Sequence, residues 1–264
     1  MLRLGQPRSD SHAKIQRGRS ELASQWNFES NPPVSEQPSS RRSGLPHNPG
    51  LRELVTSKSK WSGASPLELG RRGFHGWHER GYLPHRDGPG LTQFVTFHLT
   101  DSFPAALRSE WEAILKVENV QARREQLQAY LDKGNGGCLL RRPDLAKLVE
   151  DSFRFFHGKR YELRAWVVMP NHVHVLFQTG NESMSRTVEN WKKFTAHEAN
   201  KLTGRQGQFW FEDYWDTFMR DSEHELRTRQ YIEANPVKAF LAGEAKEWLW
   251  SSARLRDEHG RLTL

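Results

Sequence analysis

The sequence has little cysteine, no long apolar run and, beyond its first 72 residues, almost no net charge. Cys138 is the only cysteine, which excludes a disulfide framework and a Cys-x-x-Cys zinc site and is typical of a reducing compartment. No segment is apolar enough over the required length to cross a bilayer or to act as a secretory signal. We therefore expect no membrane association and a cytoplasmic location.

The positive charge is concentrated at the N-terminus. Residues 1–72 carry 12 Lys and Arg against 6 Asp and Glu, whereas the rest carries 27 against 26. This segment is rich in Ser, Pro, Arg, Asn and Gly and has no sustained apolar period, so we expect either a disordered basic arm or an over-called start. Such an arm could hold phosphate in a salt-sensitive way or could be solvated without function. We expect one catalytic domain over residues 73–256 and a C-terminal tail over 257–264.

Two histidines stand next to a turn. Val167 to Phe177 reads as strand, turn and strand, with Pro170-Asn171 between the strands. Side chains at i and i+2 of a strand share a face, so His172 and His174 should project together. The pair could bind a metal ion, but a half-buried strand that happens to carry two histidines has the same pattern.

A tyrosine follows 57 positions after His174. Ser222 to Asn235 has a helix signature, with Ser222 as N-cap, and we expect this helix to stop at Asn235-Pro236. Tyr231 and Asn235 are four residues apart, which is one helical turn, so a phenol and a carboxamide should lie on one face. Of the five tyrosines, only Tyr231 has a metal-ligating side chain at i+4. The alternative is a core tyrosine followed by a helix-terminating asparagine.

In their order along the chain, these motifs resemble the REP-associated tyrosine transposases, a branch of the single-tyrosine HUH transposases. The resemblance covers roughly residues 81–254. It rests on the segments beginning at Gly81, Gln93, Arg164, Trp191, Phe209, Tyr214, Arg220, Tyr231 and Trp248. Two positions depart from the family pattern: Phe240 stands where Gly is usual, and Leu249 where Pro is usual.

The resemblance implies a role for each site residue. Tyr231 would be the nucleophile, and His172, His174 and Asn235 would hold one divalent cation. Two imidazoles alone could hold Zn²⁺, but an amide oxygen favours a harder ion, and the family implies Mg²⁺ or Mn²⁺. The product would be a 5′-phosphotyrosine with a free 3′-hydroxyl. The partner would be single-stranded DNA with a REP-like hairpin, bound by a monomer or a homodimer.

Nine further side chains are candidates for DNA contacts, because each is basic, aromatic or a histidine near one of these motifs. They are Arg80, Tyr82, His85, Arg141, Arg142, Lys192, Lys193, Arg220 and Lys238. An ordinary solvated side chain is the alternative for each. His75, His78 and His85 lack a nearby carboxylate pattern, so we interpret them as surface or nucleic-acid contacts rather than as a metal site.

The order of predicted elements gives the fold class. We expect strands at 93–99, 161–169, 172–178 and 208–211, and helices at 104–131, 144–156, 185–202 and 222–235. This is an α+β fold with helices on an antiparallel sheet, and the family implies the ferredoxin-like variant of it.

Three functions fit this sequence. The preferred one is a single-strand DNA transposase that cleaves and rejoins DNA at palindromic hairpins. The alternatives are a catalytically idle DNA-binding regulator derived from a transposase, and a metal-dependent phosphodiesterase in which Tyr231 is structural.

Overall fold

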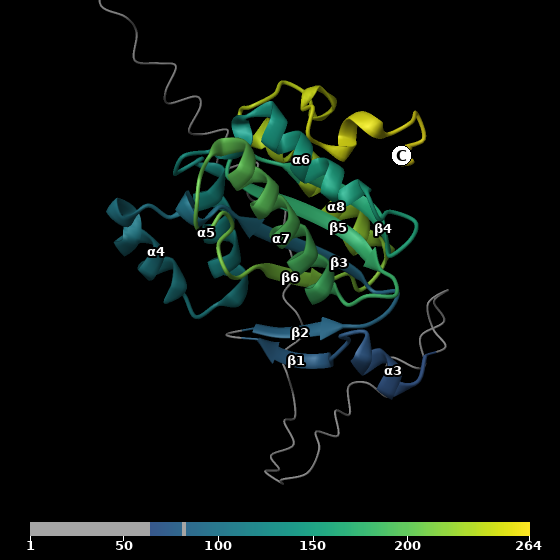
Figure 1. The fold of residues 1–264 in the computed structure, drawn as a ribbon. Coiled ribbons are helices and arrows are strands. Elements are labelled where there is room, and N and C mark those ends of the chain that lie inside the picture. Colours follow the sequence, from purple (N-terminus) through teal and green to yellow (C-terminus); the bar gives the residue numbers. More distant parts are fainter. Residues whose placement is uncertain (1–63, 81–82) are drawn as a thin grey trace, which may run out of the picture.

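The computed structural model describes residues 64–80 and 83–264. A four-stranded antiparallel sheet lies at its centre, in the spatial order β4-β5-β3-β6 (Figure 1). The strands are β3 (Thr92–His98), β4 (Tyr161–Val168), β5 (His172–Thr179) and β6 (Trp215–Phe218). One crossover helix, α6 (Pro143–Arg154), precedes β4, and another, α7 (Met184–Thr203), follows β5. This order of elements and strands is the ferredoxin-like arrangement, so the predicted fold class is confirmed.

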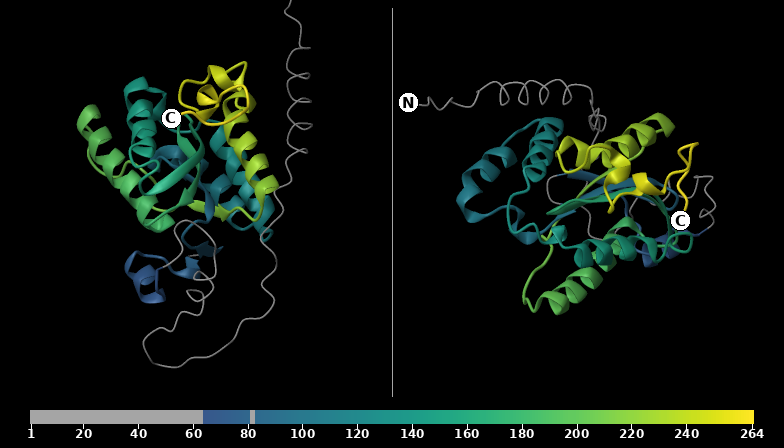
Figure 2. Two further views of the ribbon diagram at one scale, coloured as in Figure 1. Left: turned by 90° about the vertical axis from the view of Figure 1, so that its right-hand side faces the viewer. Right: turned by 90° about the horizontal axis from the view of Figure 1, so that it is seen from above.

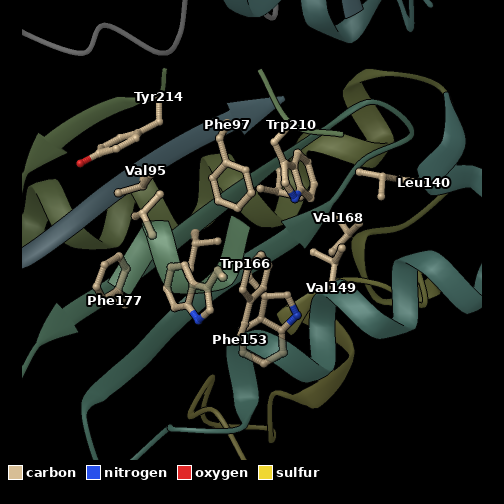
Figure 3. Packing of buried hydrophobic residues seen from close by; sticks show 14 of the residues in the cluster. Val95, Phe97, Leu140, Val149, Phe153, Trp166, Val168, Phe177, Trp210 and Tyr214 are labelled. Carbon is tan, nitrogen blue, oxygen red and sulfur yellow. The ribbon is translucent and has the colours of Figure 1, made fainter. Parts of the chain in front are cut away.

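The two faces of the sheet are covered by different helices. Helices α6 and α7 lie on one face and α8 (Ser222–Lys238) lies on the other (Figure 2). The larger core lies under α6 and α7, where Phe97, Trp166 and Phe177 are fully buried (Figure 3). A smaller apolar cluster under α8 contains Phe94 and Ile232. Burial of large aromatic side chains under α6 and α7 contributes most to the stability of the core. The face under α8 has a smaller apolar cluster and can carry polar groups.

Strand register decides which polar groups face α8. Thr96 on β3 is opposite His174 on β5, and His98 is opposite His172. Directly opposed residues of an antiparallel pair project from the same face. All four side chains therefore lie on the α8 face, while Val95 and Phe97, which alternate with Thr96 and His98 along β3, enter the larger core.

Two predicted elements differ from the structure. The helix expected over 104–131 is divided into α4 (Arg108–Leu115) and α5 (Val120–Asp132). The division occurs because Asn119 caps a new helix, its side chain accepting a hydrogen bond from the Ala122 N–H at 2.9 Å. The strand predicted at 208–211 was wrong: Trp210 makes only an isolated bridge to Leu99, and the strand that pairs with β3 is β6.

Helix α8 is longer than its sequence predicted. Asp221, not Ser222, is the N-cap, accepting a hydrogen bond from the His224 N–H at 2.7 Å. At the other end the helix continues through Pro236 to Lys238, so the expected stop at Asn235 was wrong. A proline this close to a helix end removes only one hydrogen bond of the ladder. Asn235 is therefore a helical residue whose side chain shares a face with Tyr231.

Short elements precede the sheet. They are α3 (Pro66–Arg71), β1 (Gly76–Arg80) and β2 (Leu83–Asp87), of which β1 and β2 pair as a hairpin. Helix α3 lies inside the segment expected to be an arm, so regular structure begins before residue 73; residues 1–63 lie outside the described chain. The division into arm, domain and tail stays a prediction.

The C-terminal segment packs along the edge strand β4. The Val168 N–H donates to the Trp250 carbonyl at 2.8 Å and the Trp166 N–H to Ser252 Oγ at 3.0 Å. The expected tail also folds back, with the Thr263 N–H donating to the Leu255 carbonyl at 2.9 Å. Among the described helices, none combines the length and the apolar character that crossing a membrane needs.

Candidate active site

His172 and His174 form a buried pair on β5. Both side chains are 0 % exposed, and their ring centroids are 4.8 Å apart. The His172 Nδ1 lies 2.8 Å from Asn171 Oδ1, and the Asn171 amide nitrogen donates to the Asn135 carbonyl at 3.2 Å. Because that second bond fixes the orientation of the amide, His172 Nδ1 is the donor and its Nε2 carries the lone pair. The predicted juxtaposition of the two imidazoles is present.

The surroundings keep both imidazoles neutral. Burial, together with the charge of Lys238, lowers the pKa of His174 to about 3. Burial also lowers the pKa of His172 well below its ordinary value, with His174 and His98 acting in the same direction. The neutral imidazole is the form that binds a metal ion. A hydrogen bond of 2.7 Å between Thr96 Oγ1 and His174 Nδ1 leaves Nε2 of that ring for a ligand.

Tyr231 reaches this pair from α8 of the same chain. Its ring centroid lies 5.8 Å from that of His174 and 6.2 Å from that of Phe94. The side chain is half-buried and packs against the apolar cluster under α8. Lys238, two turns further along the helix, has its Nζ 4.6 Å from the centroid of the tyrosine ring. The phenol is thus held between an imidazole and an ammonium group.

Asn235, one helical turn after Tyr231 on α8, carries a buried amide. The residue is 0 % exposed, and neither its Oδ1 nor its Nδ2 has a hydrogen-bond partner among the described residues. The Nε2 of His174 is also buried, and no residue that the structure describes is hydrogen-bonded to it. An unsatisfied buried polar group costs about 1–3 kcal/mol, so two of them on facing elements indicate a site for a ligand.

These donors fit a divalent cation. Two imidazole nitrogens and an amide oxygen leave positions for water and phosphate around a six-coordinate ion. Within residues 64–80 and 83–264, no three His, Cys, Asp or Glu side chains are grouped so that they could hold a metal ion. A site at this position therefore needs the amide oxygen of Asn235.

Helix α5 adds two side chains that the sequence did not indicate. Asp132 Oδ1 lies 3.7 Å from His172 Nε2. The Gln128 amide nitrogen donates to Asp132 Oδ1 at 2.7 Å and lies 3.4 Å from His172 Nε2. Burial raises the pKa of Asp132 to about 7, opposed by Gln128 and by the charge of Lys238. Burial lowers the pKa of Lys238 to about 8, opposed by Asp132. In the sequence, these two residues stand out only by their i, i+4 spacing, and this spacing matches no known motif.

The predicted DNA contacts are spread over several surfaces. Lys192 and Lys193 lie on α7, on the face of the sheet opposite α8; Lys192 Nζ donates to the Glu212 carbonyl at 2.7 Å, and Lys193 pairs with Glu189 at 2.6 Å. Arg142 pairs with Asp144 at the start of α6 at 2.6 Å. Their role in binding DNA stays a prediction.

The other candidate DNA-contacting residues lie at different places in the fold. Arg141 and Arg220 are exposed, Arg80 and His85 lie on β1 and β2, and Tyr82 lies outside the described residues. Lys238, by contrast, contacts Tyr231 itself, so it lies within the site rather than on an outlying surface.

Comparison with known proteins agrees with the resemblance. Residues 143–235 match the family described as IS200-like transposases. This segment begins at the first residue of α6 and ends at Asn235, so it contains His172, His174 and Tyr231 as well. The resemblance to these transposases is therefore confirmed over that segment.

Two individual proteins are similar to this chain. A REP-associated tyrosine transposase of Escherichia coli (strain K12) is 26 % identical over 94 residues, which are 35 % of this chain and 54 % of that protein. The chain thus spans about half the length of this curated relative. A solved structure of the REP-associated tyrosine transposase bound to a REP hairpin aligns with a TM-score of 0.41 and 19 % identity, over 67 % of this chain and 82 % of that one.

Proposed function

We propose that this chain, whose residues 143–235 match the IS200-like transposases, is a DNA transposase that cleaves and rejoins single-stranded DNA. In this proposal Tyr231 is the nucleophile and His172, His174 and Asn235 hold a divalent cation, Mg²⁺ or Mn²⁺. The substrate class is DNA with a REP-like hairpin, by analogy with the REP-associated relative. It is supported by the short distances between the rings of His172, His174 and Tyr231, and by the position of Asn235 one turn after Tyr231 on α8.

One observation carries the proposal: the ring of Tyr231 lies 5.8 Å from the ring of His174, within one chain. A nucleophile must come within about 3–3.5 Å of the atom it attacks. The phosphorus of a phosphate bound beside the imidazoles would be within attacking distance of the phenol oxygen. The arrangement also supports a site assembled from a single chain, because no second copy is needed to bring tyrosine and histidines together.

The chemical step is a transesterification at phosphorus. The Tyr231 oxygen forms a bond to phosphorus while the bond to the 3′ oxygen breaks, which gives a 5′-phosphotyrosine and a 3′-hydroxyl. The phenol loses its proton and the leaving oxygen gains one, so the reaction needs neither ATP nor water. When bound, the cation supplies Lewis-acid polarisation of the phosphate.

Two features of the chain prepare Tyr231 for this step. A free phenol has a pKa near 10 and is a weak nucleophile at neutral pH. The ammonium group of Lys238 over the ring favours the phenolate form. Packing of the ring against Phe94 restricts its orientation, which reduces the entropy lost on reaching the phosphate.

The test uses a 3′-labelled hairpin oligonucleotide with a short unpaired segment and an excess of Mg²⁺ or Mn²⁺. The wild-type protein should form a covalent adduct that survives denaturation and carries the label. Tyr231→Phe should form none while binding the hairpin within about twofold, since only the reacting hydroxyl is removed.

Tyr214→Phe is the matched control, because Tyr214 is a buried tyrosine in the larger core and its loss should leave the adduct intact. Hairpin binding without cleavage by the wild type would favour an idle regulator. Cleavage that survives Tyr231→Phe would favour a phosphodiesterase that activates water. Either result would overturn the proposal.

A further inference from the structure

Helix α8 is held on the sheet largely by polar groups. The residues that it buries are mostly polar: His224, Thr228, Ile232, Glu233, Asn235 and Pro236. The apolar cluster under this helix is also smaller than the one under α6 and α7. Apolar contacts are non-directional, so directional bonds are needed to fix the rotation of α8 and its position along the sheet.

Glu233 supplies such bonds through a buried ion pair. Its Oε1 accepts hydrogen bonds from Ser252 Oγ and from Arg256 Nε, each at 2.6 Å. The side chains of Glu233 and Arg256 are 12 % and 9 % exposed. Because charge-assisted bonds of a guanidinium group add geometric specificity, the carboxylate holds α8 at one position relative to the C-terminal segment.

Ser252 and Arg256 are bound in turn to the backbone of β4. Ser252 Oγ accepts a hydrogen bond from the Trp166 N–H at 3.0 Å, and Arg256 Nη2 donates to the Arg164 carbonyl at 2.7 Å. Strand β4 pairs with β5, the strand that carries His174. Two residues of the C-terminal segment therefore connect the helix of the tyrosine with the strands of the histidines.

Arg254 fastens the same segment to the opposite face of the sheet. Its Nη2 lies 2.8 Å and 2.7 Å from the two carboxylate oxygens of Glu150 on α6. Glu150 is 2 % exposed, and its Oε1 also accepts a hydrogen bond from the Trp166 indole N–H at 3.0 Å. The segment is thus attached on both sides of β4, which makes it a firm support for α8.

We propose that residues 251–256 form a clamp on α8, with Glu233, Ser252 and Arg256 as positioning residues for Tyr231. This inference rests on the proposed function, in which Tyr231 is the nucleophile. Ser252 and Arg256 follow the segment 143–235 that matches the transposase family, so the family match assigns them no role.

The clamp acts on Tyr231 through the rotation of its helix. Glu233 follows Tyr231 by two residues, which places the two side chains about 160° apart around the helix axis. Fixing Glu233 therefore prevents a rotation that would move the phenol away from His174. A displacement of about 1 Å at a reacting group can slow a reaction about a hundredfold.

A double variant, Glu233→Met with Arg256→Met, tests the clamp without leaving an unpaired buried charge. Apolar residues in place of a buried ion pair are often neutral or stabilising, so its thermal unfolding should stay close to that of the wild type. Its single-turnover rate of adduct formation with the labelled hairpin should fall about tenfold or more. Hairpin affinity should stay within about twofold, because the loss concerns the reacting group.

Two single variants support this test. Glu233→Gln keeps an Oε1 that can accept both hydrogen bonds, so it should recover part of the rate. Ser252→Ala removes the hydroxyl between Trp166 and Glu233, and it should slow adduct formation if the double variant does not fold.

Hydrogen–deuterium exchange of the DNA-free protein tests the clamp without reference to catalysis. Loss of the clamp should speed exchange over residues 222–238 about tenfold or more and leave exchange over 184–203 unchanged. Glu223→Met with Arg227→Met is the matched control, since it removes an exposed ion pair of 2.6 Å within α8 itself. This control should leave both the adduct rate and the exchange of α8 within about twofold of the wild type.

The outcomes separate the two proposals. If the Glu233 and Arg256 double variant keeps the wild-type adduct rate, the clamp does not position Tyr231 and the proposed function is untouched. A rate that falls only together with thermal stability would show that the ion pair merely stabilises the fold, which also overturns the inference. If the wild type forms no adduct at all, the proposed function fails, and the exchange of α8 alone decides whether the clamp holds this helix.

Discussion

The ammonium group of Lys238 lies over the ring of Tyr231, with Nζ 4.6 Å from the ring centroid. The two residues are two turns apart on α8, so the contact depends on the helix continuing past Pro236. A cation over an aromatic face contributes about 0.5–2 kcal/mol. Lys238 therefore connects the shape of α8 with the reactivity proposed for Tyr231.

We expect Lys238→Met to slow adduct formation about tenfold, because about 1.4 kcal/mol of stabilisation corresponds to that factor. The methionine keeps much of the apolar stem and removes the charge. Single-turnover adduct formation with labelled hairpin measures the rate, and hairpin affinity at the same salt concentration should change only a few fold. Lys193→Met, on the opposite face of the sheet, is the control; equal slowing in both variants would argue for a general charge effect.

Mixing experiments test whether the site is assembled within one chain. Tyr231 and His174 meet in the same chain, so mixing Tyr231→Phe with His172→Ala should restore no adduct formation. If tyrosine and histidines came from different subunits, a mixed dimer would contain one intact site and up to half of the dimers would be active. The readout is the adduct yield after co-refolding of the two variants at equal concentration.

Local spacing predicted which side chains share a face, because a shared face depends only on short-range periodicity. The i, i+2 pair of histidines and the i, i+4 pair of Tyr231 and Asn235 each fix a shared face, whatever the rest of the fold does. Lys238 was expected to lie just after the helix, because Pro236 was read as the end of the helix. Asp132 escaped notice because its approach to His172 arises from the packing of α5 against the sheet, which no local pattern encodes.

Local patterns also predicted the fold class. The fold prediction was wrong for individual elements. The strand, turn and strand pattern of Val167 to Phe177 predicted the hairpin of β4 and β5. Phe209 and Trp210 suggested a strand but enter the core as irregular chain, whereas β6 contains Asp216 and was overlooked. Aromatic side chains indicate burial more reliably than they indicate a strand.

Asn235→Ala separates stability from metal binding. The Asn235 amide is buried and has no hydrogen-bond partner within residues 64–80 and 83–264, so its removal relieves a desolvation cost and should leave the free energy of unfolding in EDTA unchanged or higher by about 1 kcal/mol. The same variant should bind Mn²⁺ several fold more weakly and need more metal for adduct formation. Urea unfolding and Mn²⁺ titration give the two quantities. A large loss of stability would instead mean that the amide makes hydrogen bonds within the protein.

Acid should destabilise the fold through His98. This residue is 0 % exposed and stacked between Phe211 and Trp215, and burial lowers its pKa to about 4. The unfolded chain binds a proton near pH 6.5 and the folded chain only near pH 4, so stability falls as the pH decreases between these values. The loss from this one residue is about 3 kcal/mol by pH 4.

Urea unfolding in EDTA from pH 7 to pH 4 measures this dependence. His98→Phe keeps an aromatic ring in the stack and cannot be protonated, so its stability should fall less steeply with pH than that of the wild type. His197→Gln, at an exposed position of α7, should follow the wild type. Parallel curves for His98→Phe and the wild type would show that other groups dominate the acid response.

Phe240 gives the last prediction, because it departs from the family pattern at a position with a special backbone conformation. Its φ is +57°, in the left-handed region, and its side chain is 64 % exposed. A non-glycine residue costs about 1 kcal/mol or more in this region, and an exposed ring regains little of that by packing. Phe240→Gly should therefore raise the free energy of unfolding by about 1 kcal/mol, reduced somewhat by the greater entropy of glycine in the unfolded chain.

Two further substitutions at this position serve as controls. Phe240→Asn, which tolerates the same conformation, should have a stability between those of the wild type and Phe240→Gly. Phe240→Val should be less stable than the wild type, because a β-branched side chain is disfavoured in the left-handed region. If Phe240→Gly is destabilising in urea unfolding, the ring makes contacts that outweigh the strain, and the departure from glycine is a packing adaptation of this chain.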